Sequence, residues 1–209
     1  MKTLLFFFIS SFLFFACQKS SPSGSATSSN NSSIEVEPQH IKFFKEYPQF
    51  KSTAFDYPVG KPDAKGYYNA QGFQKNNHLG DDWNAVTGGN TDLGDPIYAI
   101  SNGYVVFAQD LKGGWGKVVR VVHMLAGPNP RWVESVYAHC DSILVEKGQG
   151  VKIGEKIATI GNADGAYLAH LHLEIRDSLD MPIGGGYSTQ TKGYLDPSIF
   201  IEQHRNIPQ

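Results

Sequence analysis

The chain has 209 residues, of which 41% are hydrophobic and 18% charged, so it can form a folded domain and is not disordered throughout. Eighteen basic and 20 acidic residues give a formal charge of −2, which disfavours a dedicated nucleic-acid binder. Two cysteines exclude a disulfide scaffold and a cysteine-rich zinc fold.

The N-terminus has the pattern of an export signal. Lys2 gives a basic start, and residues 4–16 are almost wholly apolar. A membrane-spanning helix needs about 20 such residues, so this stretch is too short to span. Its end, Ala16 followed by Cys17, resembles the lipobox of bacterial lipoproteins. That resemblance implies a signal peptide over residues 1–16 and a lipidated Cys17 that anchors the protein to a membrane; ordinary secretion with cleavage nearby is the alternative.

A serine-rich segment follows the signal. Eight of the 16 residues in 18–33 are serine and none is large and apolar, so this segment cannot bury enough surface to order itself. We therefore expect a flexible tether over residues 17–40. A lead-in segment over 41–54 comes next, with a short helix over 41–47 that ends at Pro48.

The remaining chain has the pattern of a β domain. Glycine-containing turns recur at short intervals from residue 55 onward, and short β-type runs separate them. These runs cover 96–100, 103–108, 117–123, 133–139, 157–160 and 168–176. We predict an all-β domain of antiparallel sheets ending near residue 201, followed by a C-terminal tail over 202–209.

Histidines mark the first candidate metal ligands. In a strand over 169–175, alternation places His170, His172 and Glu174 on one face, with Leu171, Leu173 and Ile175 facing the core. Two neighbouring histidines on one polar face can address a single metal ion. Solvated histidines on an edge strand are the alternative for this pair.

Two further segments carry histidines. His78 and Asp82 are four residues apart with Gly80 between them, which predicts a turn that directs both inward. An imidazole and a carboxylate together suit zinc. His139 ends the run 133–139, in which alternation would place it on the same face as Tyr137.

Taken together, the three segments form a pattern that is much more specific than any one of them. H-x-G-x-D at 78–82, Y-x-H at 137–139 and H-x-H at 170–172 resemble the LytM/lysostaphin-type peptidases of family M23. Segments 94–99, 102–106, 145–155, 161–162 and 195–197 resemble other parts of the family pattern. The resemblance covers residues 55–201 and implies an antiparallel sheet sandwich that forms a groove, of the duplicated hybrid-motif type.

The resemblance also implies roles for the residues. His78, Asp82 and His172 would bind Zn²⁺ and leave a fourth position open for water. His139 and His170 would be the catalytic histidines: one accepts the proton of the water, and the other stabilises the oxyanion or protonates the leaving amine. Which histidine does which stays open. Glu174 would orient one of the metal ligands without binding the metal itself.

The resemblance is compatible with two alternative functions. The first is a zinc endopeptidase that hydrolyses the peptide cross-links of peptidoglycan, held by its lipid anchor in the cell envelope on the periplasmic or outer-membrane side. The alternative is a catalytically silent M23-type scaffold that binds and activates another cell-wall hydrolase; a regulatory protein partner is compatible with both. A biotinyl or lipoyl carrier is set aside, because neither Met124 nor Met181 has a lysine beside it.

Several residues near the motifs are predicted to have no role in metal binding. His123 is expected to point outward from its strand, and Cys140 to face the core. Tyr67 and Tyr68 are expected to pack. The others in this group are His40 and His204 at the surface and Asp81 out of register. The loop 125–134, with Trp132, is expected either to lie beside the groove or to be a plain surface loop. The glycine runs at 113–114 and 184–186 are expected beside the groove.

Overall fold

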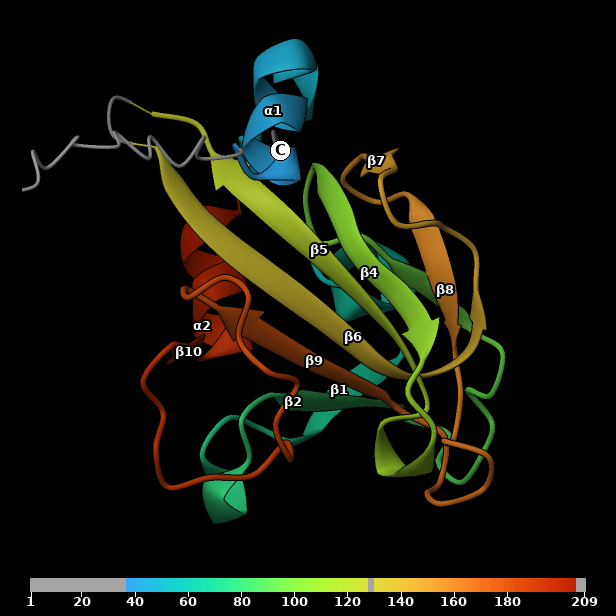
Figure 1. The fold of residues 1–209 in the computed structure, drawn as a ribbon. Helices are drawn as coiled ribbons and strands as arrows, with labels where there is room; N and C mark the ends of the chain where they lie inside the picture. The colour runs from blue at the N-terminus through green and yellow to red at the C-terminus, as the bar shows by residue number, and fades with distance from the viewer. Residues whose placement is uncertain (1–36, 128–129, 206–209) are drawn as a thin grey trace, which may run out of the picture. The chain divides into compact units, whose positions relative to one another are not determined.

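The computed structural model describes residues 37–127 and 130–205. The predicted signal peptide, Cys17 and nearly all of the predicted tether lie outside these residues. Within them lie ten strands and two α-helices, joined by short helical turns (Figure 1). The helices are α1 (Gln39–Glu46) and α2 (Pro197–His204). The strands are β1 (Tyr67–Gln71), β2 (Asp81–Ala85), β3 (Pro96–Tyr98), β4 (Gly103–Asp110), β5 (Lys117–Leu125), β6 (Arg131–Ile143), β7 (Gly150–Val151), β8 (Lys156–Ile160), β9 (Leu171–Arg176) and β10 (Tyr194–Leu195).

All ten strands belong to one sheet, and every pairing between them is antiparallel. The main order is β1-β2-β9-β6-β5-β4-β7, with β10 on the edge of β9 and with β8 joining β3 to β6. Strand β9 lies between β2 and β6, so its residues have neighbours on both sides. The predicted all-β antiparallel fold is confirmed, and each of the six predicted β runs overlaps a strand.

Some local predictions need correction. The predicted inward turn over 78–82 is wrong for its second half, because strand β2 begins at Asp81 and carries Asp82. Helix α2 extends through His204, three residues into the segment predicted to be a tail. The Asp196 carboxylate caps this helix by accepting from the backbone N–H of Ile199 at 3.0 Å, and Pro197 occupies the first turn. This Asp-Pro pair is the sequence signal for the helix.

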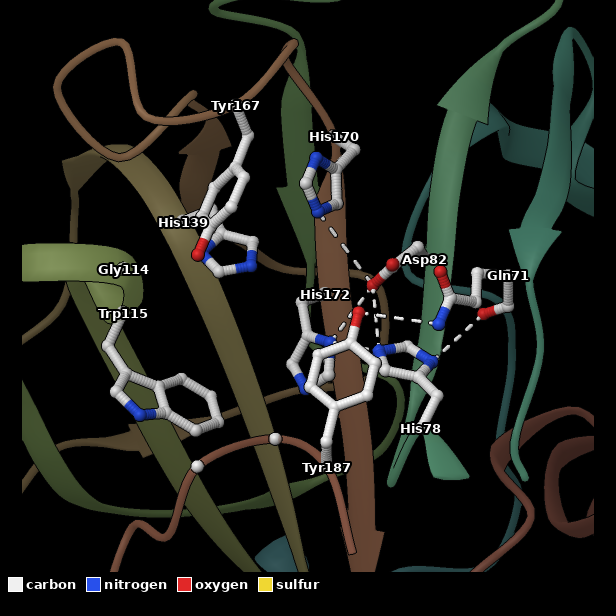
Figure 2. Close-up of a pocket in the computed structure, with 12 residues that line it drawn as sticks. Gln71, His78, Asp82, Gly114, Trp115, His139, Tyr167, His170, His172 and Tyr187 are labelled. Carbon is white, nitrogen blue, oxygen red and sulfur yellow. Dashed lines mark hydrogen bonds and ion pairs between the residues drawn. The ribbon is translucent and has the colours of Figure 1, made fainter. Parts of the chain in front are cut away.

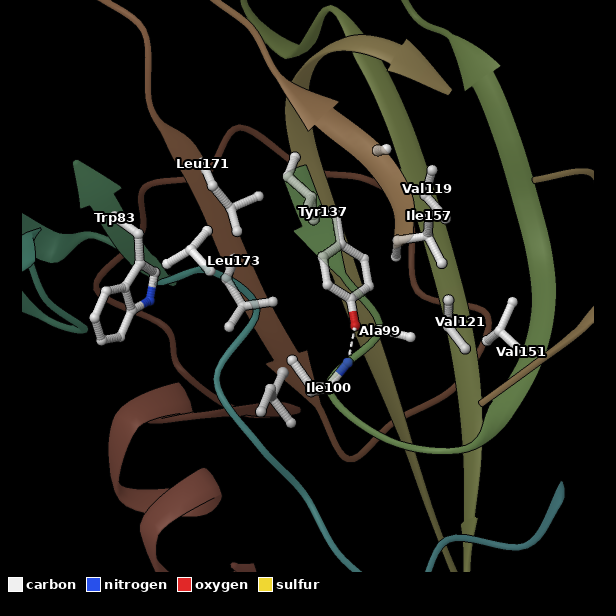
Figure 3. Close-up of a cluster of buried hydrophobic side chains, with 14 of the residues drawn as sticks. Trp83, Ala99, Ile100, Val119, Val121, Tyr137, Val151, Ile157, Leu171 and Leu173 are labelled. Carbon is white, nitrogen blue, oxygen red and sulfur yellow. Dashed lines mark hydrogen bonds between the residues drawn. The ribbon is translucent and has the colours of Figure 1, made fainter. Parts of the chain in front are cut away.

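The main hydrophobic core is formed by side chains from one face of β9 and β6, together with side chains of β3, β5 and β8. Leu171, Leu173 and Ile175 are fully buried there, as the alternation in β9 predicts (Figure 3). Cys140 is also in this cluster, which confirms that it faces the core. Burial raises the pKa of the Cys140 thiol to about 12, so the group stays protonated and unreactive.

His123 is buried, and the prediction that it points outward is wrong. Its Nδ1–H donates to the backbone oxygen of Asn102 at 2.8 Å, and its Nε2 lies 2.7 Å from the Ser135 hydroxyl. Burial lowers the pKa of His123 to about 4, although the bond to Asn102 opposes this shift. The ring is therefore neutral at physiological pH and serves as a hydrogen-bonded part of the core.

Tyr137 connects with this polar core. Its hydroxyl accepts from the backbone N–H of Ile100 at 2.9 Å and lies 3.1 Å from the Ser135 hydroxyl (Figure 3). We expect Tyr137→Phe to lower the free energy of unfolding by about 1–3 kcal/mol, because two buried polar groups lose a partner. Tyr68→Phe at the surface is the control and should change stability by less than about 0.5 kcal/mol. Denaturant unfolding measures both; equal small effects would contradict the assignment.

The predicted helix over 41–47 is confirmed as α1. Phe43 and Phe44 pack it against Tyr104 of β4 and Trp132 of β6. Trp132 therefore contacts the N-terminal segment, and the expectation that its loop lies beside the groove is wrong for the described residues. No described helix combines the length and hydrophobicity that crossing a membrane requires.

Candidate metal centre and groove

Strand register brings three predicted ligand residues together. Asp82 of β2 pairs directly with His172 of β9, and His172 pairs with Ala138 of β6 on its other side. His78 stands just before β2, where an isolated bridge joins it to Tyr187. Residues nearly 100 positions apart in the sequence thus meet at one level of the sheet (Figure 2).

The donor atoms of His78, Asp82 and His172 converge; we call these residues the His–Asp–His cluster. His172 Nδ1 lies 3.0 Å from His78 Nε2 and 2.9 Å from Asp82 Oδ1, and His78 Nε2 lies 3.3 Å from the same carboxylate oxygen. The two histidines are almost completely buried, and Asp82 is partly exposed toward the pocket. Three ligand atoms therefore point at one small volume.

Outer hydrogen bonds determine which nitrogens face that volume. His78 Nδ1 lies 3.1 Å from the Gln71 carbonyl oxygen, which can only accept, so Nδ1 carries the proton and Nε2 keeps its lone pair. His172 Nε2 lies 3.2 Å from Glu174 Oε1 and donates to it, which leaves Nδ1 as the inner nitrogen. Carbonyl and carboxylate partners of this kind are typical behind metal-binding histidines.

These contacts fit a zinc ion. Two imidazole nitrogens and one carboxylate oxygen face each other, with no donor hydrogen between them unless His172 is doubly protonated. The cluster can therefore take either an extra proton on His172 or a metal ion. Zinc ligands at about 2.0–2.1 Å in tetrahedral geometry lie about 3.3 Å apart. The observed separations of 2.9–3.3 Å are close to that value.

The charges of the cluster are strongly coupled. Burial would lower the pKa of His172, but its bonds to Asp82 and Glu174 prevail and raise it to about 9 when no metal is bound. Burial would likewise raise the pKa of Asp82, whereas hydrogen bonds from His172 and His78 hold it well below its usual range. In the metal-free cluster, the extra proton on His172 thus supplies the positive charge that a bound metal ion would supply in its place.

Gly80 is required by close packing behind the cluster. A Cβ at this position would lie 2.4 Å from the Leu173 carbonyl oxygen and 2.9 Å from His172 Cε1. We expect Gly80→Ala to lower the free energy of unfolding by about 1–3 kcal/mol and to weaken metal binding, because strand β9 must shift. Gly185→Ala, whose Cβ meets nothing within 4 Å, is the control. Thermal melts with and without zinc measure both; an unaffected Gly80→Ala protein would contradict this packing argument.

His139 reaches the pocket by a β-bulge, not by alternation. Lys117 pairs with Cys140 while Val119 pairs with Tyr137, so two residues of β6 oppose one residue of β5. His139 has a φ of +59°, unusual for a residue other than glycine. Tyr137 remains in the core while His139 lines the pocket, so the prediction that they share a face is wrong.

The two remaining histidines lie side by side next to the cluster. The ring centroids of His139 and His170 are 4.7 Å apart. His170 Nδ1–H donates to the Leu168 carbonyl at 2.8 Å, which leaves its Nε2 free 3.8 Å from Asp82 Oδ1. Nδ1 of His139 is buried and has no hydrogen-bond partner among the described residues.

His139 is held neutral. Burial, followed by the nearby His172 and His170, lowers the pKa of His139 to about 3. A neutral imidazole can accept a proton, which a protonated one cannot. The geometry therefore places two candidate acid–base groups beside a candidate metal centre.

The pocket around these residues measures about 310 Å³. Sequence reasoning missed four of its side chains: Gln71, Trp115, Tyr167 and Tyr187. Trp115 and Tyr187 adjoin the glycine runs at 113–114 and 184–186, parts of which line the pocket as expected, and this proximity was the available signal. Tyr67 packs against the core cluster, as predicted, and also bonds to Asp95, whereas Tyr68 is exposed and the packing prediction is wrong for it. Asp81 bonds to Ser198 on the far side of β2.

Fold and site together define a β protein whose pocket holds a candidate metal-ligand set of two histidines and one carboxylate. The sequence profile of Peptidase family M23 matches residues 76–185, more than half of the chain. This chain belongs to peptidase family M23, and the resemblance inferred from its motifs is confirmed.

The relatives include proteins named as lipoproteins and proteins named as murein hydrolase activators. "Lipoprotein NlpD" of Yersinia enterocolitica is 41% identical over 83 residues, which are 40% of this chain and 78% of the relative. "Murein hydrolase activator NlpD" of Escherichia coli K12 is 38% identical over 98 residues, 44% of this chain but only 24% of the relative. Among solved structures, a zinc-containing peptidase from Vibrio cholerae is 31% identical, covers 59% of this chain and 37% of its own, and has a TM-score of 0.48.

Proposed function

We propose that this protein is a zinc-dependent endopeptidase that hydrolyses peptide cross-links of bacterial peptidoglycan. The observation that carries the proposal is the set of five residues at one pocket: the His–Asp–His cluster, with His139 and His170 beside it. A scaffold that only binds a partner has no chemical need for a converging ligand set with two further imidazoles beside it. Membership of a peptidase family supports the same reading.

The proposed chemistry is amide hydrolysis. Zinc held by His78, Asp82 and His172 would supply a Lewis acid that polarises the scissile carbonyl and acidifies water. His139, neutral and next to His170, is suited to accept a proton, while the other imidazole stabilises the oxyanion or protonates the leaving amine. The Glu174 carboxylate keeps His172 in the tautomer that presents Nδ1.

The walls of the pocket suit an extended peptide with small side chains. Trp115, Tyr167 and Tyr187 give flat aromatic surfaces, and glycines at both rims leave space for a second backbone. Asp82, a ligand, is the pocket's only carboxylate among the described residues, which supply no lysine or arginine to its lining. Peptidoglycan cross-links, built from alanine or glycine and a diamino acid, are peptides of this kind.

The direct test is digestion of purified cross-linked peptidoglycan by the zinc-loaded protein. Mass spectrometry should show cross-linked dimers converted to monomers, with new free amines and no new reducing sugar ends. A chelator should stop the reaction and added zinc should restore it. Dimers that remain intact would refute the peptidase proposal, and new reducing ends would indicate a glycosidase.

The second candidate is an activator of another cell-wall hydrolase. The relative from Escherichia coli is named a murein hydrolase activator, and the name supports this reading at least as well as the enzymatic one. The His172→Ala protein separates the two candidates. If it still stimulates a second purified murein hydrolase, and the unmodified protein digests nothing alone, the chain is an activator.

We further propose that Cys17 carries the lipid anchor, as the pattern of residues 1–17 and the names of the relatives support. Cys17→Ser should move the protein from the membrane fraction to the soluble fraction, because 13 apolar residues cannot span a bilayer. Fractionation and immunoblotting measure the change. A mutant that stays with the membranes would show that another element holds it.

A further inference from the structure

The segment 181–187, which we call the strap, forms one wall of the pocket. It follows β9 and ends at Tyr187, whose ring centroid lies 5.0 Å from that of His78 (Figure 2). Gly185, Gly186 and Tyr187 line the pocket directly. The strap contains no strand or helix. Apart from the isolated bridge of Tyr187 with His78, contacts other than regular pairing determine its position.

Side chains of β5, of β9 and of the helical turn Gly113–Trp115 bind four consecutive carbonyl groups of the strap. The contacts are Arg120 Nη2 to Met181 O at 2.9 Å, Arg176 Nη1 to Pro182 O at 3.1 Å, Arg176 Nη2 to Ile183 O at 2.8 Å, and Trp115 Nε1 to Gly184 O at 3.0 Å. At the far end, the backbone N–H of Leu79 donates to Gly186 O at 2.9 Å. The strap is therefore fixed to both sides of the metal centre.

Arg176 differs from the other donors because it also binds Glu174, the carboxylate that contacts His172 of the His–Asp–His cluster. Its side chain is completely buried, and its Nε donates to Glu174 Oε2 at 2.8 Å. The other oxygen of the same carboxylate accepts from His172 Nε2 at 3.2 Å. His172, Glu174 and Arg176 are alternate residues of β9 and share one face. The contacts that connect His172 to the strap therefore run along a single strand.

We propose that Arg176 is a positioning residue that couples the strap to the metal ligand His172. Its Nε and Nη2 hold the carboxylate that orients His172, and its Nη1 and Nη2 hold two strap carbonyls. Only a guanidinium has the fixed planar donors for all these contacts, and lysine does not. The consequences for catalysis rest on the proposed function, but the coupling itself is a property of the fold.

Arg120 offers a matched control. It binds one strap carbonyl and forms a two-pronged pair with Glu134, with Nε–Oε1 at 2.9 Å and Nη2–Oε2 at 3.0 Å. Neither partner contacts His172. Loss of Arg120 should therefore loosen the strap alone, whereas loss of Arg176 should loosen the strap and disturb the metal site.

The experiment measures zinc affinity and hydrogen exchange of strap amides in the full chain. Arg176→Lys should weaken zinc binding by about 10–100-fold, the usual effect of losing a group behind a ligand, and should speed exchange over 181–187. Arg120→Lys should speed the same exchange without changing zinc affinity. Wild-type zinc affinity in Arg176→Lys, or equal losses of affinity in both variants, would overturn the proposal.

A further variant keeps the test decisive if Arg176→Lys fails to fold. The double change Glu174→Gln with Arg176→Met removes both buried charges, so no unpaired ion remains to unfold the domain. It should also show faster strap exchange and weaker zinc binding; normal values of both would overturn the proposal. Neither readout uses peptidoglycan. A protein that shows the coupling but cleaves nothing would refute only the proposed peptidase function.

Discussion

Replacing His172 with alanine is expected to abolish zinc binding and hydrolysis together. This residue has the central position in the cluster, with Nδ1 2.9 Å from Asp82 Oδ1 and 3.0 Å from His78 Nε2. Without it, two ligands remain, too few for the three-ligand arrangement of a catalytic zinc site. Elemental analysis of the purified protein and peptidoglycan digestion measure the two losses.

The control for this substitution is His40→Ala, which removes a histidine that lies against Trp132 of β6, away from the pocket. It should keep about one zinc per chain. Stoichiometric zinc in the His172→Ala protein would contradict the proposed ligand set.

The pH dependence of zinc binding gives an independent check of the same ligand. In the metal-free protein the pKa of His172 is raised to about 9, so below that pH a proton must leave before zinc binds. The apparent zinc affinity should then fall by about tenfold for each pH unit below 9, since one proton is displaced. Excess zinc should extend activity to lower pH. An affinity independent of pH would contradict this displacement.

Replacing His139 with alanine is expected to lower activity by about 10²–10⁴-fold while zinc stays bound. His139 lies outside the His–Asp–His cluster, and its ring centroid is 5.6 Å from that of His172, so its loss should leave the ligands in place. Its pKa, lowered to about 3, keeps it neutral over the working pH range. The acid limb of the rate profile should therefore follow zinc occupancy and not protonation of His139.

The measurement for this second substitution is the digestion rate at matched zinc content. His170→Ala should show a loss of similar size, because the two imidazoles lie 4.7 Å apart and the proposed mechanism has both act on the same reacting group. A His139→Ala protein with a normal rate would exclude it from catalysis. Loss of zinc in that protein would instead make it a ligand.

Local sequence patterns are sufficient to predict the faces of the main strands, the end of helix α1 and the family of this protein. Alternation in a strand depends only on the two-residue period of the backbone, so it correctly predicts that Leu171 and Leu173 enter the core while His172 and Glu174 share the opposite face. Helix α1 has a local stop signal at Pro48, and glycine-containing turns separate the strands. The motifs at 78–82, 137–139 and 170–172 were also sufficient to identify family M23.

Only the tertiary structure decided how those residues meet. His139 enters the pocket through a bulge, which depends on how β6 registers against β5 and β8 and breaks the local alternation. His123 turns inward because Ser135 and Asn102, distant in sequence, supply buried hydrogen-bond partners. The strap takes its position from Arg120, Arg176 and Trp115, which belong to three separate segments. Each of these features depends on long-range contacts, which no local pattern encodes.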